Sequence, residues 1–196
     1  MRRILRYCVA PLLIVGICAV ECSANKRART PSDPKFLAIQ GVSVLPVVDA
    51  RAGKKAGVNL EKLQGHVVKA LQQKRYPASA AGTSGQSGEI AIEDMDSADA
   101  AFIKKLGPAD ERSVLVVFLN DITSKLTLGS TGNAELSAYL FDKDGGRLLW
   151  RGKGVGQAGQ GGLIGMPLKG MMKGQALDAA VVSLLARIPN RPKPGK

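Results

Sequence analysis

The chain has 196 residues, of which 28 are basic and 16 acidic, and its formal net charge at pH 7 is +12. This length suits one domain of ordinary size, and an apolar content of 45% excludes a wholly disordered chain. The single histidine, His66, excludes a histidine-rich metal site, and all three cysteines lie within the first 22 residues. The composition therefore predicts no metal, no other cofactor and no recognisable enzyme chemistry.

Residues 1–24 have the pattern of a secretory signal peptide. Arg2, Arg3 and Arg6 form a basic region, and an apolar run of 14 residues follows from Tyr7 to Val20. This run is shorter than the roughly 20 residues that a transmembrane helix needs, and small residues come after it. The pattern predicts export, to the periplasm or to the periplasmic face of an outer membrane, with an uncleaved anchor as the alternative.

Two cysteines stand where a bacterial lipoprotein would carry its acylated cysteine. Cys22 is preceded by Glu21 and Cys18 by Ile17, whereas signal peptidase II prefers a small residue at that place. Lipidation at Cys22 or Cys18 and simple cleavage near Ala24 are therefore both open. In either case the exported chain has no disulfide, so its stability must come from its core.

The rest of the chain divides into three parts. Residues 25–39 form a basic, proline-containing linker, residues 40–188 form one α/β domain, and residues 189–196 form a basic, proline-rich tail. The surplus of positive charge would attract anionic lipid headgroups or cell-wall polymers; the alternative is that it serves only to keep the surface solvated.

The first half of the domain predicts a βαβ unit. A β-branched run at 41–48 predicts a strand, in which Pro46 indicates a sheet edge or a bulge. Asn59 is a good N-cap for a helix whose apolar residues recur at helical spacing and which ends near Arg75, before Pro77. A short extended segment at 76–80 completes the unit.

The second half predicts a sheet closed by a helix. Ser97 can cap a short helix, and the continuously apolar run 114–119 is typical of a central strand covered on both faces. Segments 133–141 and 147–153 form a hairpin around an Asp-Gly turn, and a helix covers 175–188. The predicted fold class is α/β (α+β), with one mixed β-sheet of about five strands and helices packed on it.

The candidate chemical motifs are weak. Residues 154–159 fit G-x-G-x-x-G, but more glycine follows them where a dinucleotide site needs a helix. His66 lies inside the first predicted helix, with no serine in a nucleophile motif to accompany it. The acidic run Glu93, Asp94, Asp96 and Asp99 lacks calcium-loop spacing. Scattered basic residues and few aromatics predict no nucleic-acid partner.

One segment, 159–174, combines seven glycines with large apolar residues and contains no acid. Glycine gives such a segment freedom, and exposed methionine adapts to contact surfaces. The segment is therefore predicted as a loop that either folds back onto the core or contacts a partner or a membrane. Its predicted contact residues are Leu163, Ile164, Met166, Leu168, Met171 and Met172.

The order of these parts resembles a family of small Gram-negative envelope lipoproteins typified by a meningococcal surface vaccine antigen. The matching motifs are Val44-Leu45-Pro46, Ala98-Asp99-Ala100, Leu149-Trp150-Arg151-Gly152 and Gly161-Gly162-Leu163-Ile164-Gly165. The resemblance spans roughly 40–188. It implies a fold like the N-terminal domain of TolB, which is also found in lipoproteins that regulate cell-wall synthases, and it carries no catalytic residues.

The functional hypothesis is a non-enzymatic, periplasm-facing envelope protein that acts as an interaction or accessory subunit, of a transport system by the resemblance. It would dock an envelope protein through a sheet edge or through 159–174. The alternatives are a module that binds cell wall or anionic lipid, a regulator of a cell-wall synthase, and a hydrolase built on converging acids. The partner's identity and the oligomeric state do not follow from the sequence.

Overall fold

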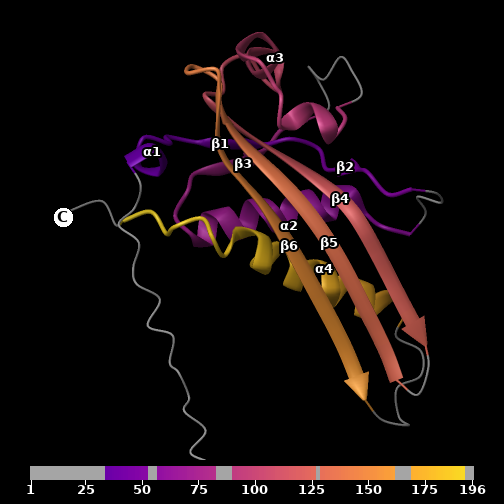
Figure 1. The fold of residues 1–196 in the computed structure, drawn as a ribbon. Helices are drawn as coiled ribbons and strands as arrows, with labels where there is room; N and C mark the ends of the chain where they lie inside the picture. The colour runs from indigo at the N-terminus through magenta and orange to yellow at the C-terminus, as the bar shows by residue number, and fades with distance from the viewer. Residues whose placement is uncertain (1–33, 53–56, 83–89, 127–128, 162–168, 193–196) are drawn as a thin grey trace, which may run out of the picture.

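The computed structural model describes residues 34–52, 57–82, 90–126, 129–161 and 169–192. They form one mixed sheet of six strands in the order β3-β1-β4-β5-β6, with β2 also paired to β4 (Figure 1). The predicted fold class is confirmed. The sheet has one strand more than expected because the predicted first strand divides into β1 (Val42–Val44) and β2 (Val48–Asp49).

Pro46 lies in the gap between these two strands. Proline has no N–H to donate to a ladder, so the strand is interrupted where it stands. The prediction of an irregularity is confirmed, but β1 is not at an edge, because it lies between β3 and β4 and runs parallel to both. On the other side of the gap, β2 resumes the pairing with β4.

The predicted βαβ unit is present. It consists of β1, α2 (Leu60–Gln73) and β3 (Ala78–Ala80), and β3 is parallel to β1. Asn59 caps α2, since its Oδ1 accepts the backbone N–H of Lys62 at 2.8 Å. The helix ends before Pro77, with Arg75 in the left-handed region at φ 71°.

The three remaining strands form an antiparallel meander. β4 (Ser113–Leu126), β5 (Gly129–Asp142) and β6 (Arg147–Gly161) are each longer than the sequence predicted. The turn between β5 and β6 confirms the predicted hairpin. There Asp142 accepts the N–H of Gly145 at 3.1 Å, and Gly146 supplies a positive φ of 58°.

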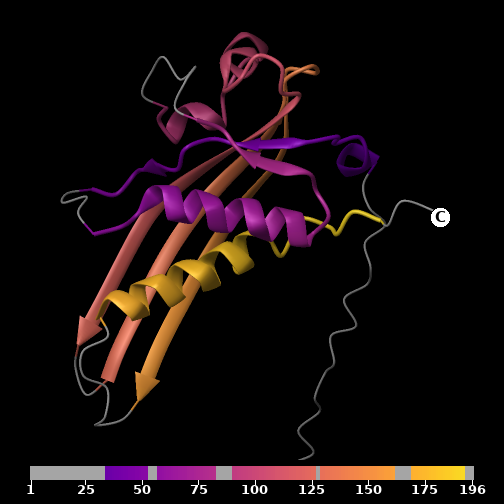
Figure 2. The same cartoon turned by 180° about the vertical axis from the view of Figure 1, so that it is seen from behind.

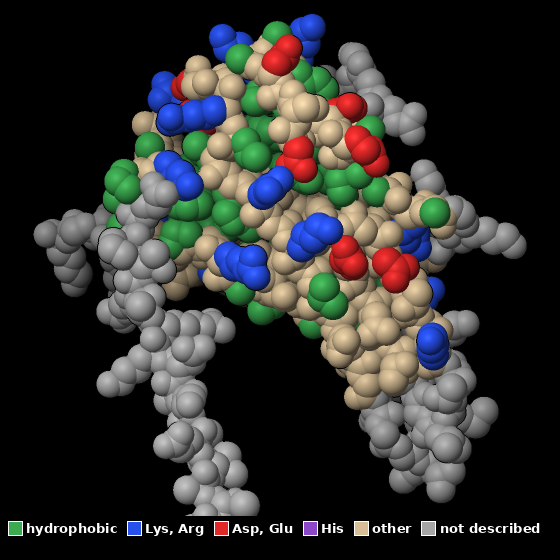
Figure 3. Space-filling view, viewed as in Figure 1, with side chains coloured by type: hydrophobic (Ala, Val, Ile, Leu, Met, Phe, Trp, Pro, Cys, Tyr) green, Lys and Arg blue, Asp and Glu red, His purple; other side chains and the backbone are tan. Residues whose placement is uncertain are grey.

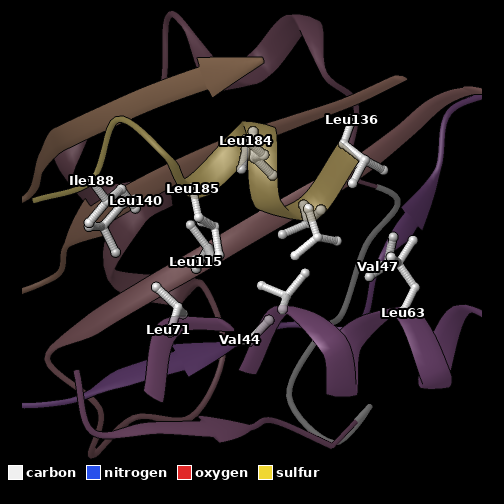
Figure 4. Close-up of a cluster of buried hydrophobic side chains, with 14 of the residues drawn as sticks. Val44, Val47, Leu63, Leu71, Leu115, Leu136, Leu140, Leu184, Leu185 and Ile188 are labelled. Atoms are coloured by element: carbon white, nitrogen blue, oxygen red, sulfur yellow. The ribbon is translucent and has the colours of Figure 1, made fainter. Parts of the chain in front are cut away.

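Two helices cover one face of the sheet. α2 and α4 (Lys169–Leu185) lie side by side on it (Figure 2). The side chains between these helices and the sheet form the larger core, whose aliphatic residues interdigitate in Figure 4. Leu115, Val117 and Leu119 of β4 point into this core.

The other face is covered only in part. The segment with the 3₁₀ turn η1 (Glu93–Met95) and α3 (Ala100–Lys105) lies over the first half of β4 and contributes a second, smaller core. Val114, Val116 and Phe118 of β4 point into it, so residues 114–119 have both faces covered, as predicted. Asp99 caps α3 by accepting the N–H of Phe102 at 2.7 Å, in place of the predicted Ser97.

Parts of the predicted linker and tail belong to the folded body. Residues Pro34–Leu37 form the short helix α1, and Phe36 and Ile39 are buried in the larger core. Near the C-terminus, Pro189 accepts the hydroxyl of Tyr76 at 2.9 Å. Among the residues that the structure describes, no helix is long and apolar enough to span a membrane.

Candidate interaction surface on the sheet

The second half of the meander has one face covered by α4 and one face turned away from both long helices. In β6 the exposed residues Lys153, Val155 and Gln157 alternate with the buried Gly154 and Gly156. The register places these three exposed residues opposite Ser137, Glu135 and Asn133 of β5. We call this surface the open face. With exposed or half-buried residues of β4 and β5 it consists of Asp121, Thr123, Lys125, Thr131, Asn133, Glu135, Lys153, Val155 and Gln157.

The glycines of β6 are required by the helix behind them. A Cβ at Gly156 would lie 1.9 Å from the backbone oxygen of Ala176, and one at Gly154 would lie 2.3 Å from that of Ala180. Both distances are far below van der Waals contact, so only glycine lets α4 approach the strand this closely. The G-x-G-x-x-G sequence is thus part of a strand that contacts a helix backbone, and it does not form a phosphate loop.

β6 is also an edge strand. It ends the strand order, and no strand among the described residues pairs with its outer side. Residue 149 is bulged, because Leu140 faces Trp150 while Phe141 faces Leu148. From Trp150 to Gly161 the pairing with β5 is regular, which leaves a long stretch of backbone able to receive another strand.

The charged side chains along β6 are all basic. Arg147, Arg151 and Lys153 have side chains that are 67%, 66% and 75% exposed. Each faces one acid: Arg147 Nε lies 3.3 Å from Asp142, Arg151 Nη1 2.7 Å from Asp96, and Lys153 Nζ 3.9 Å from Glu135. Figure 3 shows basic and acidic side chains together over this side of the sheet.

The predicted loop 159–174 is strand at its beginning and helix at its end. Its first residues end β6 and its last ones begin α4, while 162–168 lie outside the described residues. Met171 is 47% exposed, so its side chain is available for contact. Met172 is 2% exposed and its backbone lies against Gly132, so its prediction as a surface contact is wrong.

The other residues singled out by the sequence either lie outside the described residues or make structural contacts. Cys18, Cys22, Leu163, Ile164, Met166 and Leu168 lie outside the described residues. In the acidic run, Asp96 pairs with Arg151 and Asp99 caps α3. Within the part of the chain that is described, no three His, Cys, Asp or Glu residues form a group that could hold a metal ion.

His66 lies at a separate, half-open pocket of about 160 Å³ between α2 and α4. Its Nδ1 is 2.5 Å from Asp178 Oδ1, and Lys62 and Lys173 also line the pocket. The pair joins the two helices, and no serine, threonine or cysteine is among the residues that line the pocket. We therefore interpret His66 as a half-exposed helix residue with a structural contact.

The predicted return strand ended at Lys153, whereas β6 continues to Gly161. From Lys153 on, small and larger residues alternate with the period of a strand. Lys153, Val155 and Gln157 between Gly154, Gly156 and Ala158 are the signal that could have extended the strand.

No family model matches this chain, and no curated protein does. Among solved structures it is similar to the PelC dodecamer from Paraburkholderia phytofirmans, with 11% identity, a TM-score of 0.47, and 78% and 89% of the two chains covered. Lipoprotein GNA1162 from Neisseria meningitidis gives 18% identity, a TM-score of 0.46, and coverages of 67% and 91%. The hypothetical protein CT253 from Chlamydia trachomatis has 12% sequence identity and a TM-score of 0.47, with 76% of this chain and 95% of that chain covered.

The structural neighbours thus include proteins named as lipoproteins. With TM-scores below 0.5, these likenesses carry no argument about what this chain does or where it lies.

Proposed function

We propose that this chain is an exported envelope protein that works without catalysis, as an accessory subunit that contacts a partner protein through β6 and the open face. Residues 1–24 have the pattern of an export signal, and lipidation at Cys22 would tether the domain to a membrane. The observation that carries the proposal is the unpaired outer side of β6, fifteen residues long, beside a face that no described helix covers.

The surface offers what a protein contact needs. Backbone N–H and C=O groups along an edge can pair with an incoming strand, and alternate side chains can select its sequence. Val155, 55% exposed, lies in the middle of the open face and would lose water on docking. Arg151 and Lys153 precede it along the strand and would select the partner's charge.

Photo-cross-linking in the native envelope tests the proposal. The full chain carries a benzophenone amino acid at position 155, and a matched chain carries it at 182. Val155 and Val182 are both exposed valines, at 55% and 68%, but Val182 lies on α4. We expect a discrete protein adduct from position 155 and none from 182. Equal adducts from both positions, or none from 155, would contradict the proposed contact surface.

The alternative function, a module for anionic lipid or cell-wall polymer, is favoured by the net charge of +12. It differs from a strand contact in its response to salt, because exposed charges more than about 10 Å apart are screened at 0.1 M ionic strength. If washing the envelope in high salt before illumination removes the position-155 adduct, Coulomb attraction alone holds the partner. Persistence of the adduct supports a contact made by backbone pairing and apolar burial.

A further inference from the structure

The charge around the β6 edge has one sign over a long stretch of chain. No Asp or Glu occurs between Asp144 and Asp178, whereas that interval contains five basic residues. They are Arg147, Arg151, Lys153, Lys169 and Lys173. The interval includes the whole of β6 and the start of α4. The edge available for pairing is therefore also the most consistently basic part of the folded chain.

Each cation of β6 has one acid near it, but these ion pairs are exposed. The side chains of Arg151 and Asp96 are both more than half exposed, and Lys153 Nζ is 3.9 Å from Glu135. Exposed ion pairs of this kind are weak, typically below about 1 kcal/mol, so either cation can turn to a new carboxylate at little cost. The edge thus presents cations that a partner can recruit.

The strand geometry determines where a partner's acids would lie. Arg151, Lys153, Val155 and Gln157 point to the same face, because side chains alternate along a strand. A strand added beside β6 places its own side chains about 5 Å from these. Carboxylates at alternate positions of that strand, opposite Arg151 and Lys153, would complement the edge.

A second copy of the chain fits this edge less well. Pairing two β6 strands would bring three cations from each copy into one pair of strands with no acid from either strand. Like charges on neighbouring strands oppose such pairing. The charge argument therefore favours a different chain, one that is acidic and extended.

We propose that the β6 edge binds an extended acidic segment of a partner protein as an added strand. This inference rests on the proposed function and names the chemistry of its partner. The acids of the segment would face Arg151 and Lys153, and its backbone would pair with β6.

Binding of designed peptides to the full chain tests this inference. The probe is a ten-residue fluorescent peptide in which glutamate alternates with valine, and its matched control has lysine in place of every glutamate. The third and fourth peptides keep the glutamates. Each is N-methylated at alternate backbone amides, so that the third has no N–H donors along one edge of the strand and the fourth has none along the other edge. We expect the glutamate peptide to bind at least about tenfold more tightly than the lysine peptide. One of the two N-methylated peptides should lose binding, because it cannot donate to the edge of β6.

Variants of the chain distinguish binding at the β6 edge from attraction by any basic residue of the surface. Arg151→Ala combined with Lys153→Ala should weaken the glutamate peptide about tenfold. Lys125→Ala removes a cation from the same open face, but on β4, two strands from the edge, and should leave binding within twofold. Because all three side chains are exposed, the variants should fold like the parent, which circular dichroism checks.

Three results would overturn the inference: equal binding of the glutamate and lysine peptides, undiminished binding of both N-methylated peptides, or equal losses in the Lys125 and Arg151/Lys153 variants. If position 155 still cross-links a partner in the envelope, only the acidic-strand inference fails. If position 155 yields no adduct either, the proposed function fails with it.

Discussion

The two edges of the sheet are built differently. The β3 edge is three residues long, follows Pro77, and has the side chain of Gln72 donating to Ala78 O at 2.9 Å. The β6 edge is fifteen residues long and contains no proline. Proteins commonly protect edges by making them short or by placing charges on them. Here β3 is short, whereas β6 is long and depends on Arg151 and Lys153.

This difference shows that a long edge strand can stay in place when its neighbours hold it firmly. β6 is held by β5 on one side and by α4, which contacts the backbone of Gly154 and Gly156. Within the described part of the chain, β3 is held mainly by its pairing with β1 and its contact with α2. A stable, accessible edge is suited to recognition, and a short one is suited only to closing the sheet.

The largest effect should come from separating α4 from β6. Gly156→Val would place a Cβ 1.9 Å from the oxygen of Ala176, so the helix must move away and the core beneath it must open. We expect a loss of about 3 kcal/mol or more in the free energy of unfolding, measured by urea titration. The matched control is Gly65→Ala in α2, where a Cβ meets nothing within 4 Å. It should gain about 0.5–1 kcal/mol, because alanine favours the helix. Equal stability of Gly156→Val and the parent would show that α4 does not depend on this contact.

A smaller effect should follow from removing the charges of the long edge. Arg151→Val combined with Lys153→Val leaves β6 with β-branched residues on the open face, so its edge should pair with copies of itself. We expect self-association to tighten about tenfold in analytical ultracentrifugation. Ser79→Val places the same residue type in the three-residue β3 and should leave the molecular mass unchanged. Similar association of both variants would mean that edge length has no part in the effect.

The smallest effect concerns the segment beside the short edge. Tyr76 precedes β3, is buried, and donates its hydroxyl to Pro189 at 2.9 Å. Tyr76→Phe should cost about 1 kcal/mol near neutral pH, because Pro189 O loses its donor. Burial raises the pKa of the Tyr76 phenol above 10.0, although the charge of Arg191 opposes this.

The raised pKa gives this prediction a pH dependence. The folded state holds the proton more tightly than the unfolded state, so the contribution of Tyr76 is complete below about pH 10 and falls as the pH rises through the folded pKa. The stability difference between the parent and Tyr76→Phe should therefore shrink in strongly alkaline urea titrations. Tyr139, whose pKa burial also raises, is present in both chains and cancels in the difference. A difference that does not change with pH would contradict the raised pKa.

The fold was predictable where one local signal was strong. The run 114–119 is apolar without interruption, and the strand is indeed covered on both faces. Asn59 before an amphipathic run located the start of α2, and the Asp-Gly turn located the hairpin. Each signal works because it is local: a cap, a turn or a periodicity is read from neighbouring residues.

The candidate site was less predictable. The sequence suggested a sheet edge or the segment 159–174, but it did not indicate which strand is the edge or that Met172 is buried. The predicted strand ended before Gly154 and Gly156, and glycine weakens a strand in isolation. These glycines are explained by α4, whose contacting residues lie twenty or more positions further along the chain.

The sequence by itself determined the export signal pattern, the cysteine-free body, the apolar centre of β4 and the excess of basic residues. These properties depend on composition and on short-range order. Only the tertiary structure decided that β6 is the free edge, that its glycines admit α4, and that Arg151 and Lys153 lie along exposed backbone. Such features depend on which distant segments meet, because packing between a strand and a helix is a property of both partners at once.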